Sequence, residues 1–235
     1  MKAMSSLVNS VGIFVDTFRY MKRVSNPNEN IIHLKKQWGK SILNRLRVDL
    51  KVVGQVSKLD SMLFLGNHLS YLDIPLLMSC ADNLSFVAKQ EIGSWPIFGS
   101  AARKVDTVFV KRENANSRKS ARKRIQEALE NKQRIVIFPS GTTCLFETKP
   151  WRKGAFEIAH DKDVFIQPFR ISYAPQRAVA YIENDFFLSH LYQLCSFDRI
   201  EATIEFHDPV KIRVPAWDCH HWHYWSRGLT DGRQH

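Results

Sequence analysis

The sequence lacks the signatures of several common enzyme classes. It contains no Gly-rich phosphate-binding loop of the Walker or dinucleotide type. It also lacks a Gly-x-Ser-x-Gly elbow, and Ser140 stands instead in Pro-Ser-Gly-Thr-Thr, which argues against a serine hydrolase. The cysteines form no Cys-x-x-Cys pair, which argues against a zinc site and fits free thiols in a reducing compartment; they are Cys80, Cys144, Cys195 and Cys219.

A hydrophobic run long enough to cross a membrane is missing from the N-terminus. The apolar residues between positions 7 and 20 are interrupted by Asp16 and Arg19. The uncharged portion is therefore shorter than the roughly 18 residues that a transmembrane helix needs, and no signal-peptide cleavage site follows. Because Lys22 and Arg23 come next, we expect an amphipathic helix that lies on a membrane surface. A helix that packs on the protein's own core is the alternative, and periodicity does not separate the two.

Acidic side chains are few relative to basic ones. The chain has 34 Lys and Arg against 23 Asp and Glu, a formal net charge of +11, so its partners are expected to be anionic. Nucleic acid is disfavoured, because the densest charge block, residues 111–134, has neither interleaved aromatic residues nor a docking motif. Ile125, Ala128 and Leu129 instead give this block the buried stripe of a solvated helix. Acidic lipid and phosphate-bearing small molecules are the other anionic partners that this charge suits.

The hydrophobic pattern predicts an α/β protein with a mixed central sheet flanked by helices. After a break at residues 25–28, a second helix is expected at 31–46, with a basic row for acidic headgroups (Lys35, Lys36, Lys40, Arg45, Arg47). Strands are expected at 48–53, 62–65, 84–88, 107–110, 135–138, 164–169, 178–182 and 202–206, with helices at 74–80, 95–103, 116–131 and 151–160.

Three parts of the chain are distinguished on this basis. Residues 1–47 form two N-terminal amphipathic helices for membrane docking, 48–214 form the main domain, and 215–235 form a C-terminal tail. The tail is rich in possible ligands, but these are closely spaced and terminal segments are usually loose, so a metal site is not favoured. The residues concerned are Cys219, His220, His221, His223 and His235.

The stretch GNHLSYLDIP, residues 66–75, lies between two apolar segments, where a strand passes into a helix. In α/β sheets ligands gather beyond such strand ends. An Asp that accepts a hydrogen bond from one ring nitrogen of a His leaves the other nitrogen free to act as a general base toward a hydroxyl. His68 and Asp73 therefore suit catalysis. Asp73 also suits a helix N-cap, with Ser70-x-x-Asp73 as a capping box, and both roles can coexist.

Four blocks between residues 48 and 171 resemble, in order, those of the glycerolipid acyltransferases. GNHLSYLDIPLL is similar to their Asn-His-x-Ser-x-x-Asp form of the His-x4-Asp motif. Residues 86–99 with 106–112 resemble a second block, a Lys-x-Glu stretch that ends in Phe-x-x-Arg. IVIFPSGTT resembles a third, Phe-Pro-Glu-Gly-Thr, and FIQPFRI a fourth, around Pro168.

The resemblance implies transfer of an acyl group from acyl-CoA or acyl carrier protein to the hydroxyl of a lyso-lipid, with 1-acylglycerol-3-phosphate as the expected acceptor. It implies no metal and no cofactor beyond the acyl co-substrate, and a place on the cytoplasmic face of a membrane, peripheral or monotopic. His68 would be the base and Asp73 its partner. Acceptor binding would fall to Lys89, Arg112, Ser140, Gly141 and Thr142. As alternatives, Arg112 is a surface charge at a strand end and Gly141 a simple turn residue.

The chain departs from the resembled pattern at three positions. Ser140 replaces the usual Glu, Thr143 a frequent Arg, and Asp106 a common Gly. The loss of a carboxylate and a guanidinium from one pocket changes its charge and hydrogen bonding, and so leaves the acceptor open. A threonine after the Gly-Thr pair, here Thr143, resembles the motif of relatives that acylate lyso-ornithine lipids. The alternatives are therefore a lyso-ornithine lipid acyltransferase or a non-catalytic relative that binds anionic lipid.

Overall fold

The computed structural model describes residues 2–94, 98–104, 107–111, 114–182 and 185–231. Its helices are α1 (Lys2–Val24), α2 (Ile31–Arg45), α3 (Asp73–Cys80), η1 (Gln90–Ser94), α4 (Phe98–Lys104), α5 (Ala115–Glu130), α6 (Gly154–Asp161), α7 (Gln176–Val179), α8 (Phe187–Leu194) and α9 (Pro215–Asp231). Its strands are β1 (Val48–Val53), β2 (Met62–Gly66), β3 (Leu84–Lys89), β4 (Val108–Val110), β5 (Arg134–Ile137), β6 (Phe165–Ala174), β7 (Ile200–Phe206) and β8 (Val210–Lys211).

The strands form one mixed sheet in the order β1-β7-β6-β2-β5-β3-β4, with β8 beside β6. Strands β6, β2, β5, β3 and β4 run parallel to one another, whereas β7 pairs with β6 in the antiparallel direction and with β1 in parallel. Strand β2 lies in the middle, between β6 and β5. The segment after β2 therefore emerges at the centre of one sheet edge, where parallel α/β sheets bind their ligands.

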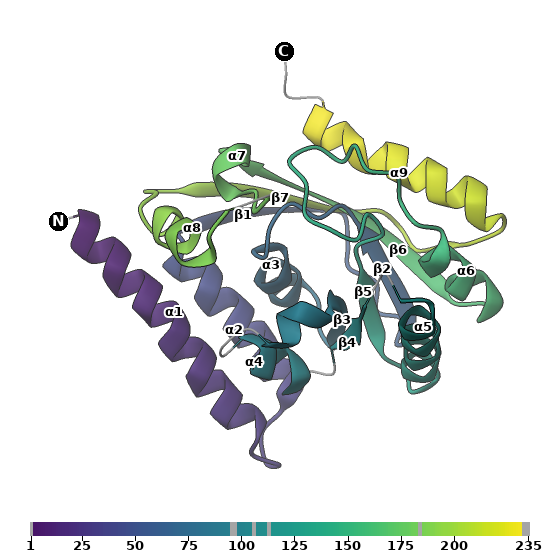
Figure 1. Cartoon of the computed structure of the whole chain (residues 1–235), viewed down its shortest axis with the longest axis horizontal. Coiled ribbons are helices and arrows are strands. Elements are labelled where there is room, and N and C mark those ends of the chain that lie inside the picture. The colour runs from purple at the N-terminus through teal and green to yellow at the C-terminus, as the bar shows by residue number, and fades with distance from the viewer. Residues whose placement is uncertain (1, 95–97, 105–106, 112–113, 183–184, 232–235) are drawn as a thin grey trace.

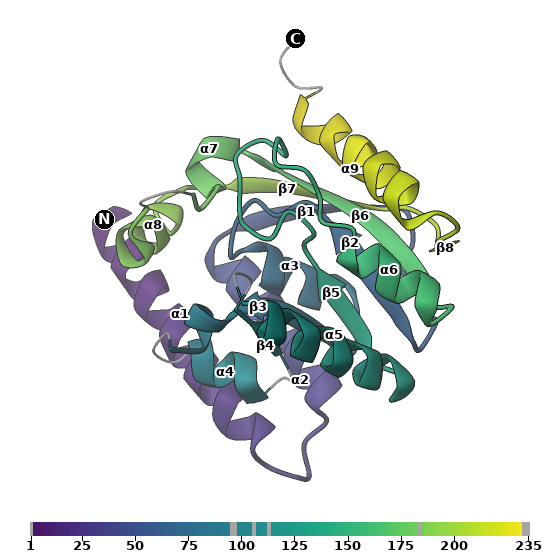
Figure 2. The same ribbon diagram turned by 45° about the vertical axis from the view of Figure 1, so that its right-hand side comes forward.

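Helices cover both faces of the sheet, which confirms the expected fold class (Figure 1, Figure 2). Alternation along the fully buried strand β2 assigns the two faces. Phe64 packs in a core that includes Leu43, Leu76 and Leu191, from α2, α3 and α8. Leu63 and Leu65 point the other way, into a second core shared with α5, α6 and α9. Since β2 is covered on both sides, its sequence is a continuous apolar run.

Asp16, which interrupts the apolar stretch of the N-terminus, joins α1 to α2. Its carboxylate accepts hydrogen bonds from Arg45 Nε (2.6 Å) and from Ser41 Oγ (2.7 Å). The basic row expected on α2 does not form as one exposed surface, because Lys35 is buried and its Nζ donates to the Leu84 carbonyl oxygen at 2.9 Å. Arg47 lies beyond the end of α2 and is exposed, and its guanidinium donates to the carbonyl oxygens of Cys195 and Phe197. None of the described helices combines the length and apolarity that crossing a membrane requires.

Two expectations about local structure were wrong. The apolar run at 178–182 is not a strand, because its first residues belong to α7. The Tyr181 amide donates to the carbonyl oxygen of Leu69, which lies in a loop and not in a strand. Short apolar runs are ambiguous in this way, because a helical turn buries Val179 as well as a strand would. The tail is not loose, since residues 215–231 form α9, which is anchored by the buried Cys219 and Trp222; His235 lies outside the described residues.

Candidate active site

The site begins where β2 ends, at the sequence Gly66-Asn67-His68. A side chain at Gly66 would meet the ring of Phe169 on β6 at about 2.4 Å, so only glycine allows the two strands this close. Asn67 is fully buried, and its amide both donates to the Ile171 carbonyl oxygen (2.8 Å) and accepts from the Ile171 amide (2.7 Å). Asn67 thereby continues the pairing of β2 with β6 beyond the strand, and fixes the backbone immediately before His68.

His68 and Asp73 are in direct contact, as the motif predicts. His68 Nδ1 lies 2.6 Å from Asp73 Oδ2, and the carboxylate is completely buried. The same oxygen accepts from the amides of Leu69 (2.8 Å) and Ser70 (3.1 Å). Asp73 thus holds the imidazole and the turn after it in one fixed arrangement. The ring donates from Nδ1, which leaves Nε2 unprotonated in the neutral form.

The helix-capping interpretation of Asp73 is wrong. Asp73 is the first residue of α3, and the capping position falls on Leu72, which makes no side-chain cap. The Ser70-x-x-Asp73 capping box is formed in part: Asp73 Oδ2 accepts from the Ser70 amide at 3.1 Å, and the Ser70 hydroxyl accepts from the Leu72 amide at 3.3 Å. Asp73 itself bonds the turn before the helix and is not the N-cap residue. The physical reason is direction: the carboxylate points back toward His68, away from the amides of the first helical turn.

Two residues of this centre were missed by the sequence analysis. Tyr173, at the far end of β6, donates its hydroxyl to Asp73 Oδ1 at 2.7 Å. Burial, together with the neighbouring Asp73, raises the pKa of Tyr173 well above 10.0, so it stays a donor. Phe138 stacks on the His68 ring, with centroids 3.8 Å apart and planes 8° from parallel. Both residues lie at the ends of apolar strand segments, a pattern that predicts core residues. Only their position next to His68 and Asp73 in the folded chain indicates that they belong to this centre.

The third block forms a turn next to His68. Gly141 has φ +78°, a conformation that favours glycine, and its amide donates to the Phe138 carbonyl oxygen at 2.9 Å. That amide is therefore occupied within the turn, as the simple turn interpretation predicts, and does not serve an anion. Ser140 Oγ donates to the Thr142 carbonyl oxygen (3.1 Å), and Thr143 Oγ1 donates to the Tyr181 carbonyl oxygen.

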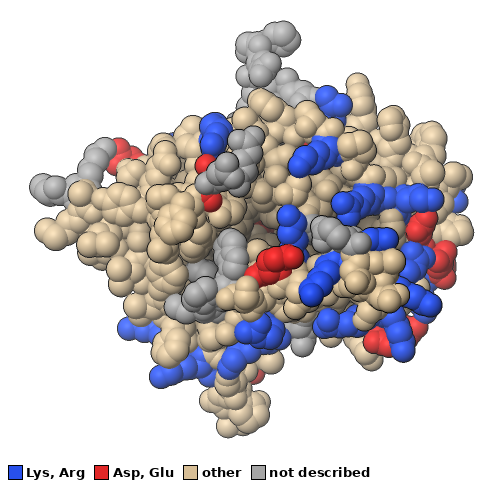
Figure 3. Space-filling model, viewed as in Figure 1, with Lys and Arg blue, Asp and Glu red and all other residues tan. Residues whose placement is uncertain are grey.

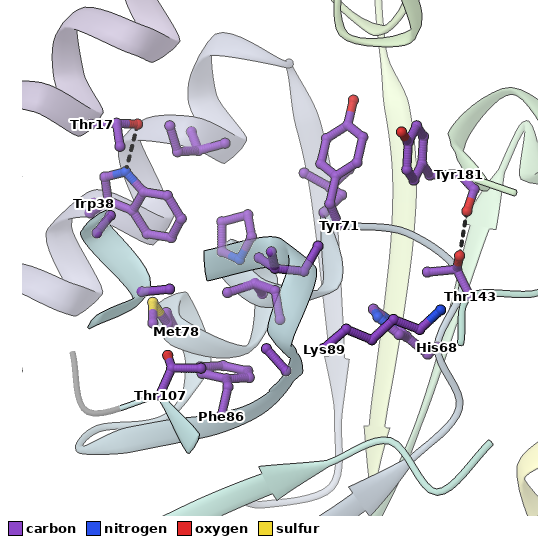
Figure 4. A pocket seen from close by; sticks show the side chains of 18 of the residues that line it. Thr17, Trp38, His68, Tyr71, Met78, Phe86, Lys89, Thr107, Thr143 and Tyr181 are labelled. Atoms are coloured by element: carbon purple, nitrogen blue, oxygen red, sulfur yellow. Dashed lines mark hydrogen bonds between the residues drawn. The ribbon is translucent and has the colours of Figure 1, made fainter. Parts of the chain in front are cut away.

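His68 opens into a cavity of about 640 Å³, within the size range of small-ligand pockets. Figure 4 shows Lys89 and His68 at one end of it, with Thr143 and Tyr181 nearby. The other end is mainly apolar, with Trp38 of α2, Met78 of α3 and Phe86 of β3 among its lining residues (Figure 4). Of the expected acceptor residues, Lys89, Gly141 and Thr142 line the cavity, Ser140 lies buried behind the turn, and Arg112 is outside the described residues.

The arrangement is suited to taking a proton from a hydroxyl beside an apolar chain. The Nε2 side of the His68 ring faces a cavity, while Nδ1 is held by a carboxylate that stabilises the imidazolium formed on proton uptake. Stacking on Phe138 fixes the plane of the ring. The apolar end of the cavity offers burial for a hydrocarbon chain, which is favourable by about 0.8 kcal/mol for each CH₂ removed from water.

Comparison with known proteins gives a consistent result. A family model described as Acyltransferase matches residues 49–172. The lyso-ornithine lipid O-acyltransferase of Pseudomonas aeruginosa is 32% identical over 182 residues, which cover 75% of this chain and 69% of the relative. The 1-acyl-sn-glycerol-3-phosphate acyltransferase of Neisseria meningitidis serogroup B is 31% identical over 125 residues, 52% of this chain and about half (49%) of the relative.

A solved structure supports the fold. The 1-acyl-sn-glycerophosphate (LPA) acyltransferase PlsC from Thermotoga maritima matches with a TM-score of 0.75 and 18% identity, covering 99% of this chain and 97% of that one. At this identity the likeness concerns the fold, including its N-terminal helices.

Proposed function

Because this chain belongs to the acyltransferase family, we propose that it transfers a fatty acyl group from a thioester to the hydroxyl of a lyso-lipid. One observation carries the proposal: the His68–Asp73 pair, with Nδ1 and Oδ2 2.6 Å apart, stands at the mouth of a cavity whose far end is apolar. Such a cavity receives an acyl chain and places its carbonyl carbon beside the hydroxyl that the imidazole deprotonates.

In the proposed reaction His68 Nε2 takes the proton of the acceptor hydroxyl while the oxygen attacks the thioester carbonyl carbon. Asp73 stabilises the imidazolium that forms. When the tetrahedral intermediate collapses, the C–S bond breaks and the imidazolium returns its proton to the leaving thiolate. A thioester is already activated, so that a positioned base and donors for the oxyanion suffice. The donor is acyl-CoA or acyl carrier protein, whose negative charges suit a chain of net charge +11.

For the acceptor we favour an amino-acid head group over a phosphate monoester. Thr143 stands at the position where the resembled motif has a frequent arginine, and its hydroxyl donates to the Tyr181 carbonyl oxygen. Arg is the side chain best suited to bidentate binding of phosphate, so its replacement weakens a phosphate site in particular. The relative from Pseudomonas aeruginosa named for lyso-ornithine lipid supports the same choice. Lys89, at the polar end of the cavity, would bind the carboxylate of such a head group.

The outer face of α1 is proposed to contact the membrane. It carries an exposed apolar row at helical spacing, whereas Ile13 and Thr17 on its inner face line the cavity. In Figure 3 uncharged side chains predominate over α1 and α8, with basic ones toward the C-terminal end of α1. Exposed apolar patches of this kind mark interaction sites, and a lipid acceptor would enter the cavity beside the helix. The row comprises Met4, Leu7, Val8, Val11, Val15 and Phe18.

The proposal is tested with purified protein, radiolabelled acyl-CoA and a panel of lyso-lipids that includes lyso-ornithine lipid and 1-acylglycerol-3-phosphate. We expect a diacylated product, formed fastest from lyso-ornithine lipid, and loss of about 10²–10⁴-fold in rate for His68→Ala. A protein that binds lipid but forms no product with any acceptor or carrier would refute it. Flotation with anionic vesicles across a salt series tests the surface contact, which should weaken partly as screening rises.

A further inference from the structure

A second carboxylate, Glu147, is completely buried behind His68. It belongs to the loop between β5 and α6, which also carries the turn at Gly141. Its Oε1 accepts from Trp151 Nε1 at 2.8 Å, and its Oε2 lies 3.4 Å from the donor Cys144 Sγ. The reaction described above assigns no role to Glu147. Burying a carboxylate costs free energy unless hydrogen-bond donors surround it, so the donors around Glu147 are informative.

This loop holds the main chain of His68 from both sides. The Cys144 amide donates to the His68 carbonyl oxygen at 2.9 Å, and Cys144 Sγ lies between that oxygen (3.8 Å) and Glu147 Oε2 (3.4 Å). The backbone N–H of His68 is among the groups that lower the pKa of Glu147 and so favour its charged form. The Ser140 hydroxyl also lies within reach of the same carboxylate. Asp73 fixes the imidazole ring, therefore, while Glu147 and Cys144 fix the backbone that bears it.

The surroundings of Glu147 consist of donors. Burial raises the pKa of Glu147 above its ordinary value, although hydrogen bonds from Trp151, Cys144, the His68 amide and Ser140 each act to lower it. The Glu147 carbonyl oxygen lies 2.9 Å from His223 Nε2, which connects the loop to α9. A carboxylate fits this cluster because it accepts from several donors at once, whereas an amide adds donors of its own.

We propose that Glu147 is a positioning residue for acyl transfer, holding the backbone of His68 so that Nε2 faces the reacting hydroxyl. The inference rests on the proposed function. It also explains how the third block works with Ser140 in place of glutamate: the carboxylate comes from seven residues further along the same loop, and Ser140 shares its pocket. The loop is thereby built around one buried negative group.

The test is an exchange of the carboxylate between the two positions. Glu147→Gln leaves a neutral amide facing donors, so kcat should fall about tenfold or more, with KM for both substrates nearly unchanged. Ser140→Glu alone places two carboxylates in one buried pocket and should also lower kcat, together with Tm. In the double variant one carboxylate is restored, and kcat should exceed that of either single variant. Glu157→Gln, which removes a partly exposed carboxylate of α6, serves as the matched control and should match the wild type.

All variants are assayed well below their Tm, so that loss of fold does not imitate loss of positioning. Additive losses in the double variant, or an unchanged kcat in Glu147→Gln, would overturn the inference while the wild type remains an active transferase. An inactive wild type would refute the proposed function instead. The Tm values of the two single variants and the double variant would then still test whether positions 140 and 147 share one carboxylate pocket. Additive changes in Tm would refute the shared pocket.

Discussion

The two faces of the central sheet are covered in different ways. On the face of α5, α6 and α9 the described side chains pack into a filled core, with Trp151, Phe156 and Trp222 between the helices and the sheet. On the face of α1 to α4 and α8 the core contains a cavity of about 640 Å³. One face therefore stabilises the strands by close packing, and the other retains the space that the substrate needs.

The difference shows how the hollow face remains folded. A cavity wall has no packing partners on one side, so its elements gain less from dispersion. Polar contacts join the helices of this face: Asp16 bonds Arg45 between α1 and α2, and Trp38 Nε1 donates to Thr17 Oγ1 at 3.1 Å. The proposed catalytic pair lies at the boundary, where His68 faces the cavity and Asp73 is enclosed by the core.

The largest expected effect concerns chemistry on the hollow face. Asp73→Asn keeps the size of the side chain and can still bond Tyr173, so we expect a folded protein. The negative charge beside the imidazolium is lost, however, and the rate should fall by about 10³–10⁴-fold. Steady-state kinetics with circular dichroism as the folding control provide the measurement. Activity within threefold of the wild type would show that Asp73 is structural only.

The second prediction contrasts the stability of the two faces. Phe156→Ala removes a fully buried ring from the filled core, which should lower the free energy of unfolding by about 3–5 kcal/mol. Met78→Ala removes a side chain that borders the existing cavity, so its effect should lie near the lower end of such truncations, about 2 kcal/mol. Urea unfolding of both variants checks the order. Equal losses would mean that the cavity wall is packed as tightly as the opposite core.

The sequence predicted most strands and the helices between them, but not the helices α7, α8 and α9. Strands 48–53 and 62–65 were found because their apolar or alternating patterns are uninterrupted and their ends carry turn residues. The run at 178–182 was misassigned, because a few apolar residues do not distinguish a helical turn from a strand. The burial of Lys35 could not be predicted either, since a lysine in a basic row is ordinarily solvated.

The site was predictable where its residues are close in sequence. His68 and Asp73 lie five residues apart, and their contact follows from a strand that passes directly into a helix. Tyr173 is 100 residues beyond Asp73, and its contact depends on the pairing of β6 with β2, which no local pattern reveals. The same holds for Glu147, whose acceptor role depends on the path of a loop.

A third prediction narrows the apolar end of the cavity. Thr107 is nearly buried and lines this end (Figure 4), so Thr107→Phe should occupy the space of the terminal methylenes of a long acyl chain. Each excluded methylene is worth about 1–3 kcal/mol in such a pocket, and the preference should shift toward shorter donors by about tenfold or more. Competition between acyl-CoA esters of different length measures the shift. An unchanged profile would place the acyl chain elsewhere.

The smallest effect concerns the rim of the hollow face and its dependence on pH. The hydrogen bond from Arg45 lowers the pKa of Asp16 below its ordinary 3.8, although burial acts in the opposite direction. Since the folded-state pKa lies below the unfolded one, the pair stabilises the fold at pH above about 4 and loses this contribution as the pH falls through the folded-state value. Asp16→Asn should therefore lower stability by about 1 kcal/mol at pH 7.

The difference between Asp16→Asn and the wild type should disappear at acid pH, once Asp16 of the wild type is protonated. Glu157→Gln on the filled face provides the comparison, because its ion pair with Arg122 is one-third exposed on both sides and should contribute less, about 0.5 kcal/mol. Urea unfolding at pH 7 and at about pH 3 distinguishes them. If the two substitutions had the same effect on stability at both pH values, the Asp16–Arg45 contact would be an ordinary surface pair. The stability of the hollow face would then depend on its apolar contacts and not on this ion pair.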